Sequence, residues 1–196
     1  MKNIPNILTT IRLASPAYFI LVILFIENVN IQTLILFYIF IFLSTTDYLD
    51  GFLARRFNIT SNYGKIFDPI SDKVLTSSAL LFLISIENKI LIPATLIIFR
   101  EFLISGTREF SLISKNSSIK VSYLSKIKTT LQFFILSSLL LLFSFQENLK
   151  LNQTISIEKL INLCNYGLWI VTFLTLYTGF QYCSIIYNKE KKGKKK

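Results

Sequence analysis

Long apolar runs separated by short polar breaks fill most of this 196-residue chain. Six such runs cover residues 7–26, 31–49, 69–86, 90–107, 127–145 and 160–187. A helix that crosses the apolar part of a bilayer needs roughly 20 predominantly apolar residues, and these runs meet or approach that length. The pattern therefore predicts an all-α, polytopic membrane protein with six transmembrane helices.

Composition supports one membrane domain rather than two soluble ones. Hydrophobic residues make up 52% of the chain and charged residues 16%, whereas soluble domains carry about 25% charged residues. We expect a membrane domain over residues 1–188, followed by a basic tail over 189–196. That tail suits the anionic cytoplasmic leaflet of a membrane. Most other basic residues lie between apolar runs, which argues against a nucleic-acid partner.

The basic residues also predict the orientation of the helices. Six spans alternate in direction, and this arrangement places 18 of the 21 Lys and Arg residues on one side. Lys89, Lys150 and Lys159 fall on the other side. Because Lys and Arg are enriched in cytoplasmic loops, we expect both termini to be cytoplasmic. The same orientation puts residues 47–72, and with them an active site, at the cytoplasmic side.

The four aspartates of the chain cluster in this segment, and the chain has no histidine. Asp47 and Asp50 are three positions apart and Asp68 and Asp72 are four apart, so on helices each pair occupies one face. Carboxylates near a bilayer are costly and usually functional. Oxygen ligands of this kind suit Mg²⁺ or Mn²⁺, and two such ions about 4 Å apart can assist a phosphoryl displacement.

Small and basic residues accompany the aspartates at fixed offsets. Gly51, Ala54 and Gly64 would let a phosphate or nucleotide approach the backbone, and Arg55 offers a fork for phosphate oxygens. Two other interpretations stay open. The segment could be a solvated helix end with packing glycines, or the aspartates could line the pathway of a divalent cation transporter. A cation pathway explains neither the small residues nor a neighbouring arginine.

The arrangement Asp-x2-Asp-Gly-x2-Ala-Arg-x8-Gly-x3-Asp-x3-Asp resembles the signature of the CDP-alcohol phosphatidyltransferase family, with every position filled. The resemblance implies a transferase that uses CDP-diacylglycerol, releases CMP and works as a homodimer in a membrane. It implies two metal ions bound by Asp47, Asp50, Asp68 and Asp72, with Asp72 also the general base. The implied CDP-binding residues are Asp50, Gly51, Ala54, Arg55 and Gly64.

A second group of residues concerns the acceptor alcohol. Arg100 and Arg108 lie about two helical turns apart, and Lys126 and Lys128 start the fifth apolar run. Such cations would bind an acceptor that carries a phosphate, although the two lysines could instead snorkel at a helix start. Residues 133–196 carry no chemical signal; their aromatic residues are expected to pack or to face lipid.

Residues 3–132 extend the resemblance to bacterial members of the family that make phosphatidylglycerophosphate. The matching segments are residues 5–12, 67–73, 100–101, 108–109 and 126–130. They imply glycerol 3-phosphate as the acceptor and the bacterial inner membrane as the location. Other acceptors, leading to cardiolipin, phosphatidylinositol phosphate or phosphatidylserine, remain possible within the shared signature.

Overall fold

The computed structural model describes the backbone of residues 4–57, 62–113, 123–146 and 151–193, and all its regular elements there are helical. Side chains are described for 6–46, 67–107, 123–146 and 156–186. The all-α prediction is confirmed. The elements are α1 (Ile4–Leu13), α2 (Ser15–Phe25), α3 (Val29–Phe57), α4 (Asn62–Ile86), the 3₁₀ turn η1 (Asn88–Ile90), α5 (Leu91–Ile113), α6 (Tyr123–Ser144) and α7 (Leu151–Gly193).

The first predicted span is broken. α1 and α2 meet at Ala14 with a bend of 44°. Pro16, at the start of α2, has no backbone N–H and cannot continue the hydrogen-bond ladder from α1. Within the described residues, five helices are long and apolar enough to cross a membrane, or six if the bent pair counts as one span.

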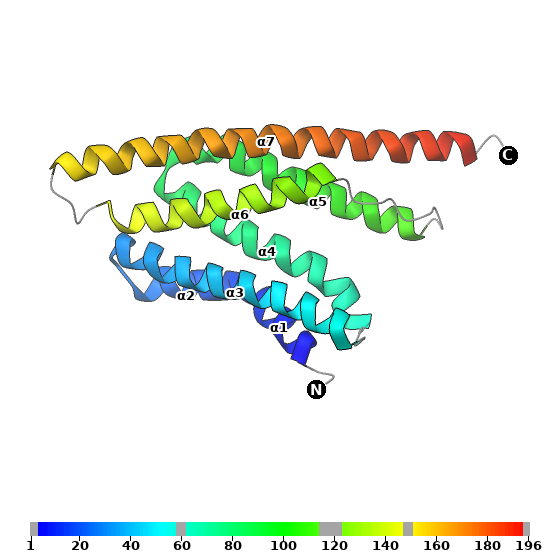
Figure 1. Ribbon diagram of the computed structural model, residues 1–196, viewed down its shortest axis with the longest axis horizontal. Coiled ribbons are helices and arrows are strands. Elements are labelled where there is room, and N and C mark those ends of the chain that lie inside the picture. Colours follow the sequence, from blue (N-terminus) through cyan, green and yellow to red (C-terminus); the bar gives the residue numbers. More distant parts are fainter. Residues whose placement is uncertain (1–3, 58–61, 114–122, 147–150, 194–196) are drawn as a thin grey trace.

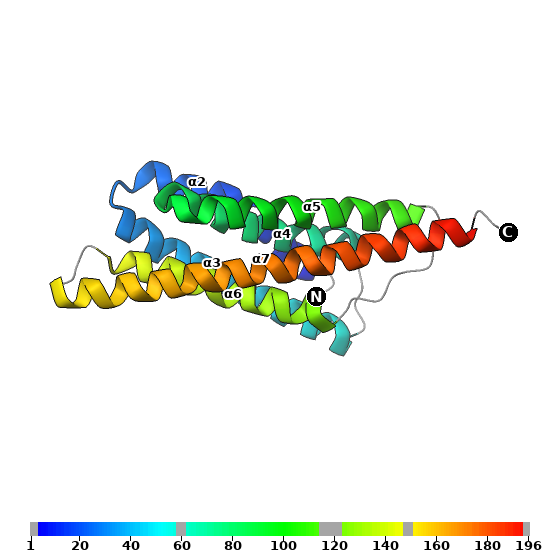
Figure 2. The same cartoon turned by 90° about the horizontal axis from the view of Figure 1, so that it is seen from above.

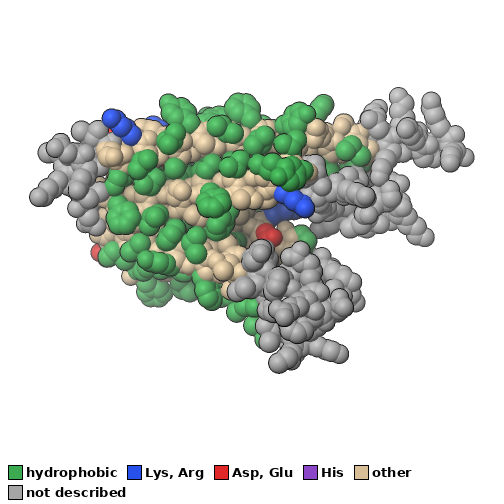
Figure 3. Space-filling model, viewed as in Figure 1, with side chains coloured by type: hydrophobic (Ala, Val, Ile, Leu, Met, Phe, Trp, Pro, Cys, Tyr) green, Lys and Arg blue, Asp and Glu red, His purple; other side chains and the backbone are tan. Residues whose placement is uncertain are grey.

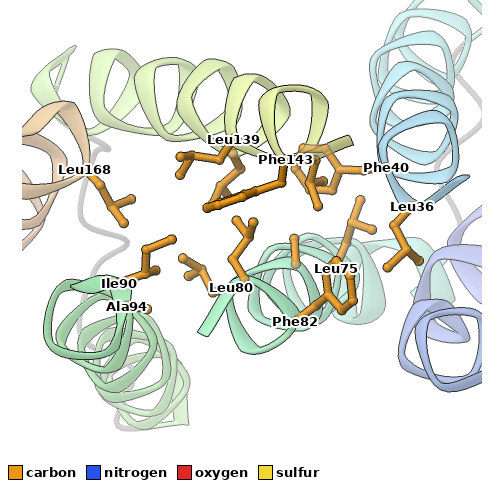
Figure 4. Packing of buried hydrophobic residues seen from close by; sticks show 14 of the residues in the cluster. Leu36, Phe40, Leu75, Leu80, Phe82, Ile90, Ala94, Leu139, Phe143 and Leu168 are labelled. Atoms are coloured by element: carbon orange, nitrogen blue, oxygen red, sulfur yellow. The ribbon is translucent and has the colours of Figure 1, made fainter. Parts of the chain in front are cut away.

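A continuous apolar core joins the long helices. α6 packs against α3 and α7, α5 packs against α7, and α1 packs against α4. Figure 4 shows side chains of α3, α4, η1, α5, α6 and α7 meeting between these elements. Phe40 of α3 is fully buried and stacks on Phe133 of α6, with ring centroids 5.3 Å apart. This interdigitation fixes α3, α4 and α6 relative to one another.

The outer surface is also apolar. Leu24, Phe25 and Phe180 are among the most exposed side chains, at 73%, 81% and 76%, and hydrophobic side chains are spread over the face in Figure 3. Soluble monomers rarely expose so much continuous apolar surface, so these side chains face lipid. The aromatic residues of the last third divide as expected, since Phe143 is buried and Phe173 is exposed.

Several helix ends lie on the same side of the bundle. α1 begins, α3 ends, α4 begins and α7 ends there (Figures 1 and 2). α7 differs from the predicted span, because it starts at Leu151 and continues to Gly193 through most of the basic tail. The polar residues before 160 and after 187 are helical although they are not apolar, so hydropathy alone missed them.

Candidate functional site

Two of the predicted metal ligands lie on one turn of α4. Asp68 and Asp72 are four positions apart on a continuous helix, as the spacing predicted. The Asp72 side chain is 52% exposed. Pro69 lies between the two carboxylates and cannot donate a backbone hydrogen bond to the preceding turn. The two carboxylates therefore project from the first half of α4 next to a weakened helical turn.

The α1 helix holds both carboxylates. Thr9 donates a hydrogen bond from Oγ1 to Oδ1 of Asp68 at 2.6 Å, and Arg12 donates from Nη1 to Oδ1 of Asp72 at 2.9 Å. Both donors are 1% exposed. The three-residue spacing of the donors on α1 matches the four-residue spacing of the acceptors on α4. Neither Thr9 nor Arg12 was predicted as a site residue, although a charged residue in an apolar run needs a partner.

The other signature residues lie outside the described side chains. Asp47, Asp50, Gly51, Ala54 and Arg55 belong to the C-terminal part of α3, a helix that contacts α4. Gly64 belongs to the first turn of α4. The helical backbone agrees with the spacing argument for Asp47 and Asp50. Their side chains are not described.

The donor set fits a hard divalent cation. Asp68 and Asp72 offer carboxylate oxygens one helical turn apart, on a partly exposed face, with no soft ligand between them. Among the described side chains, no group of three or more His, Cys, Asp or Glu residues could hold a metal. The two aspartates of α3 lie outside that set. The described part of the site is thus one half of the predicted ligand set.

A second polar cluster joins α5, α6 and α7. Lys128 of α6 is 1% exposed and pairs through Nζ with Oε1 of Glu101 on α5. Arg100 reaches the same oxygen from Nη1 at 3.5 Å, and donates from Nη2 to Oγ1 of Thr178 on α7 at 2.9 Å. This cluster places two cations around one carboxylate inside an apolar bundle.

The predicted acceptor residues do not share one environment. Arg100 and Lys128 belong to the buried cluster, whereas Lys126 is exposed. Residues two apart on a helix point in nearly opposite directions, which separates the two lysines. Arg108 belongs to α5, and its side chain lies outside the described ones. Thr178, in the region predicted to carry no chemical signal, contacts Arg100 and was missed.

The helix that carries the carboxylate pair, α4, packs against α5 and α6, which carry the cationic cluster. Lys73, the residue after Asp72 on α4, is close enough to repel the Lys128 ammonium electrostatically. On the face seen in Figure 3, acidic and basic side chains meet in a hollow of an otherwise largely apolar surface. The helix that carries the carboxylates therefore adjoins the helices that carry the cations.

Comparisons with known proteins show the family of this chain. Residues 2–178 match the CDP-alcohol phosphatidyltransferase family. A protein of Rickettsia typhi (strain ATCC VR-144 / Wilmington) is 38% identical over 182 residues, covering 93% of this chain and 96% of that protein. A protein of Bacillus subtilis (strain 168) is 32% identical over 194 residues, covering 94% and 95%. Both are named CDP-diacylglycerol–glycerol-3-phosphate 3-phosphatidyltransferase.

The family match spans the carboxylate pair, the α1 donors and the cationic cluster together. This chain belongs to the CDP-alcohol phosphatidyltransferase family.

Proposed function

We propose that this chain transfers the phosphatidyl group of CDP-diacylglycerol to glycerol 3-phosphate, giving phosphatidylglycerophosphate and CMP. The observation that supports this most is the pair Asp68 and Asp72 on α4, a helix that packs against the two helices carrying the buried cations Arg100 and Lys128. The carboxylates suit metal-assisted phosphoryl transfer, and the cations suit an acceptor that carries its own phosphate. Relatives that align over nearly the whole chain carry the name of this activity.

Two Mg²⁺ or Mn²⁺ ions would be held by Asp47, Asp50, Asp68 and Asp72. When bound, such ions neutralise charge on the attacking and leaving oxygens of a phosphoryl displacement. The residues proposed to bind the CDP group are Asp50, Gly51, Ala54, Arg55 and Gly64. Small residues in that set would allow the nucleotide to approach the helix backbone.

In the proposed reaction, Asp72 accepts the proton of the acceptor hydroxyl. The hydroxyl oxygen attacks the phosphorus that is bonded to diacylglycerol, and the bond from this phosphorus to the CMP oxygen breaks. Arg12 orients Asp72 through its 2.9 Å hydrogen bond, and Thr9 orients Asp68. Because these donors are buried, the two carboxylates are held before the substrates arrive.

The proposed acceptor-phosphate residues are Arg100, Arg108, Lys126 and Lys128. Arg100 presents a planar fork that matches phosphate oxygens. The ammonium of Lys128 has three N–H donors, so its bond to Glu101 leaves donors for a phosphate.

We also propose that the active site and both termini face the cytoplasm, in a bacterial inner membrane. The uneven distribution of Lys and Arg supports this, as does the start of α1 on the same side as the end of α7 (Figure 1). The proposed homodimer rests on the family resemblance. Protease cleavage of a C-terminal tag in sealed inside-out vesicles, but not in right-side-out vesicles, would support the orientation.

The variant Asp72→Asn separates a transferase from a cation transporter. In a transferase, it should abolish CMP release while CDP-diacylglycerol still binds, because the variant lacks the carboxylate that accepts the proton of the acceptor hydroxyl. In a transporter, the wild type should carry Mg²⁺ or Mn²⁺ across liposomes and release no CMP. Divalent-cation flux without lipid product would contradict the proposed function.

A further inference from the structure

We propose that Thr178 and Gly179 of α7 are positioning residues for Arg100, and thereby determine where the phosphate of the acceptor binds. The inference rests on the proposed function, since it concerns the acceptor side of the same reaction. It gives a role in the active site to α7, whose sequence shows no catalytic motif.

The first argument is the contact between Arg100 and Thr178. The Nη2 atom of Arg100 donates to Oγ1 of Thr178 at 2.9 Å, and the two residues are only 8% and 4% exposed. The Thr178 hydroxyl is within reach of the backbone oxygens of Leu174, at 2.8 Å, and Thr175, at 3.1 Å. Its hydrogen can therefore point along α7, which leaves the oxygen to accept from Arg100.

The second argument is the lack of space at Gly179. A Cβ atom built there would lie 3.0 Å from Nε and 3.1 Å from Cγ of Arg100. Any residue other than glycine would push on the arginine side chain near its middle. The Arg100 Nε is buried without a hydrogen-bond partner, which is consistent with a side chain placed by packing as well as by hydrogen bonds.

The third argument counts the donors of Arg100. A guanidinium group has five N–H donors, and Nε, facing Gly179, uses none in a hydrogen bond. Glu101 receives one from Nη1 and Thr178 one from Nη2. Among the described residues this leaves one N–H on each η nitrogen, and two parallel N–H groups of a guanidinium can form a two-pronged contact with a phosphate. The direction of that pair depends on the contacts with α7.

Two other positions of α7 provide matched controls. Gly167 is as tight as Gly179, because its built Cβ would lie 3.0 Å from a carbon of Ile135, but its neighbour is apolar. Thr172 is 1% exposed, and its hydroxyl bonds the Leu168 oxygen of its own helix. Substitutions there test packing and helix effects without touching Arg100.

The test is steady-state kinetics of the full chain in detergent with Mg²⁺, CDP-diacylglycerol and glycerol 3-phosphate. Thr178→Val and Gly179→Ala should each raise the KM for glycerol 3-phosphate about tenfold, the order expected for losing a hydrogen bond to a charged group. The KM for CDP-diacylglycerol should change less than twofold. Thr178→Ser should keep the wild-type KM, as should the controls Gly167→Ala and Thr172→Val.

The outcomes separate the inference from the function on which it rests. If the wild type uses glycerol 3-phosphate but Thr178→Val and Gly179→Ala leave its KM unchanged, or raise the KM of both substrates alike, the positioning role is wrong. It is also wrong if the controls raise the KM for glycerol 3-phosphate equally. If the wild type turns over only another acceptor, the proposed function fails first and the inference falls with it. Should Thr178→Val not purify as a folded protein, Gly179→Ala against Gly167→Ala decides the question.

Discussion

The ion pair between Glu101 and Lys128 makes a sharp stability prediction. Lys128 has a side-chain exposure of 1% and Glu101 of 15%, and Arg100 reaches the same carboxylate oxygen. Replacing Glu101 by Gln removes the negative charge from a site that holds two cations. Breaking a buried pair costs about 3–5 kcal/mol, because the remaining charge is left without compensation.

We expect a cost of about 3 kcal/mol for Glu101→Gln, at the low end of that range, since the glutamine oxygen can still accept a hydrogen bond. A change of this size lowers the folded-to-unfolded ratio by roughly two orders of magnitude. The double variant Glu101→Gln/Lys128→Met should regain at least half of the loss, because the Lys128 charge that Glu101→Gln leaves uncompensated is replaced by an apolar side chain.

The assay is equilibrium unfolding in mild detergent with increasing SDS, followed by circular dichroism. Glu158→Gln is the matched control, because Glu158 is an exposed acid on α7 and exposed substitutions change stability by about 0.5 kcal/mol or less. The reasoning fails if Glu101→Gln is as stable as the control, or if the double variant is less stable than the single one.

Further predictions concern the core and the metal site. Phe40→Ala should cost about 3–5 kcal/mol of unfolding free energy, whereas Phe42→Ala, at a side chain 64% exposed, should stay near wild type in the same SDS titration. Thr9→Val should weaken Mn²⁺ binding about tenfold, measured by electron paramagnetic resonance, because it removes the donor that orients Asp68; Thr10→Val, whose hydroxyl bonds the Asn6 oxygen, should bind Mn²⁺ like wild type. A chelator should abolish CMP release, and added Mg²⁺ or Mn²⁺ should restore it; activity that survives exhaustive chelation would contradict the metal assignment.

Much of the fold could be predicted because the length and hydropathy of an apolar run are sufficient to identify a helix that can cross a membrane. Each run that became one of α3 to α6 was placed within two residues at one end of the helix. At the other end, each helix continues four to eight residues beyond the apolar run. The break at Ala14 was missed, since the run on either side of it is apolar and Pro16 changes hydrogen bonding rather than hydropathy. The ends of α7 were missed because its polar residues are helical without being apolar.

The candidate site could be predicted where its chemistry is local in sequence. The spacing of Asp68 and Asp72 was sufficient to place them on one helical face. Spacing could also have separated Lys126 from Lys128, because residues two apart point to different sides of a helix. The contact of Arg100 with Thr178 joins residues 78 positions apart, and a threonine in an apolar run gives no sign of such a partner.

The measurement that tests the central claim most directly is an acceptor comparison on the purified protein with CDP-diacylglycerol and Mg²⁺. Glycerol 3-phosphate, inositol 1-phosphate, serine and phosphatidylglycerol are offered separately, and both CMP and the lipid product are followed. We predict phosphatidylglycerophosphate from glycerol 3-phosphate alone, with no product in the presence of chelator. Turnover with a different acceptor would contradict the role given to the cationic cluster, and no turnover with any of them would contradict the transferase itself.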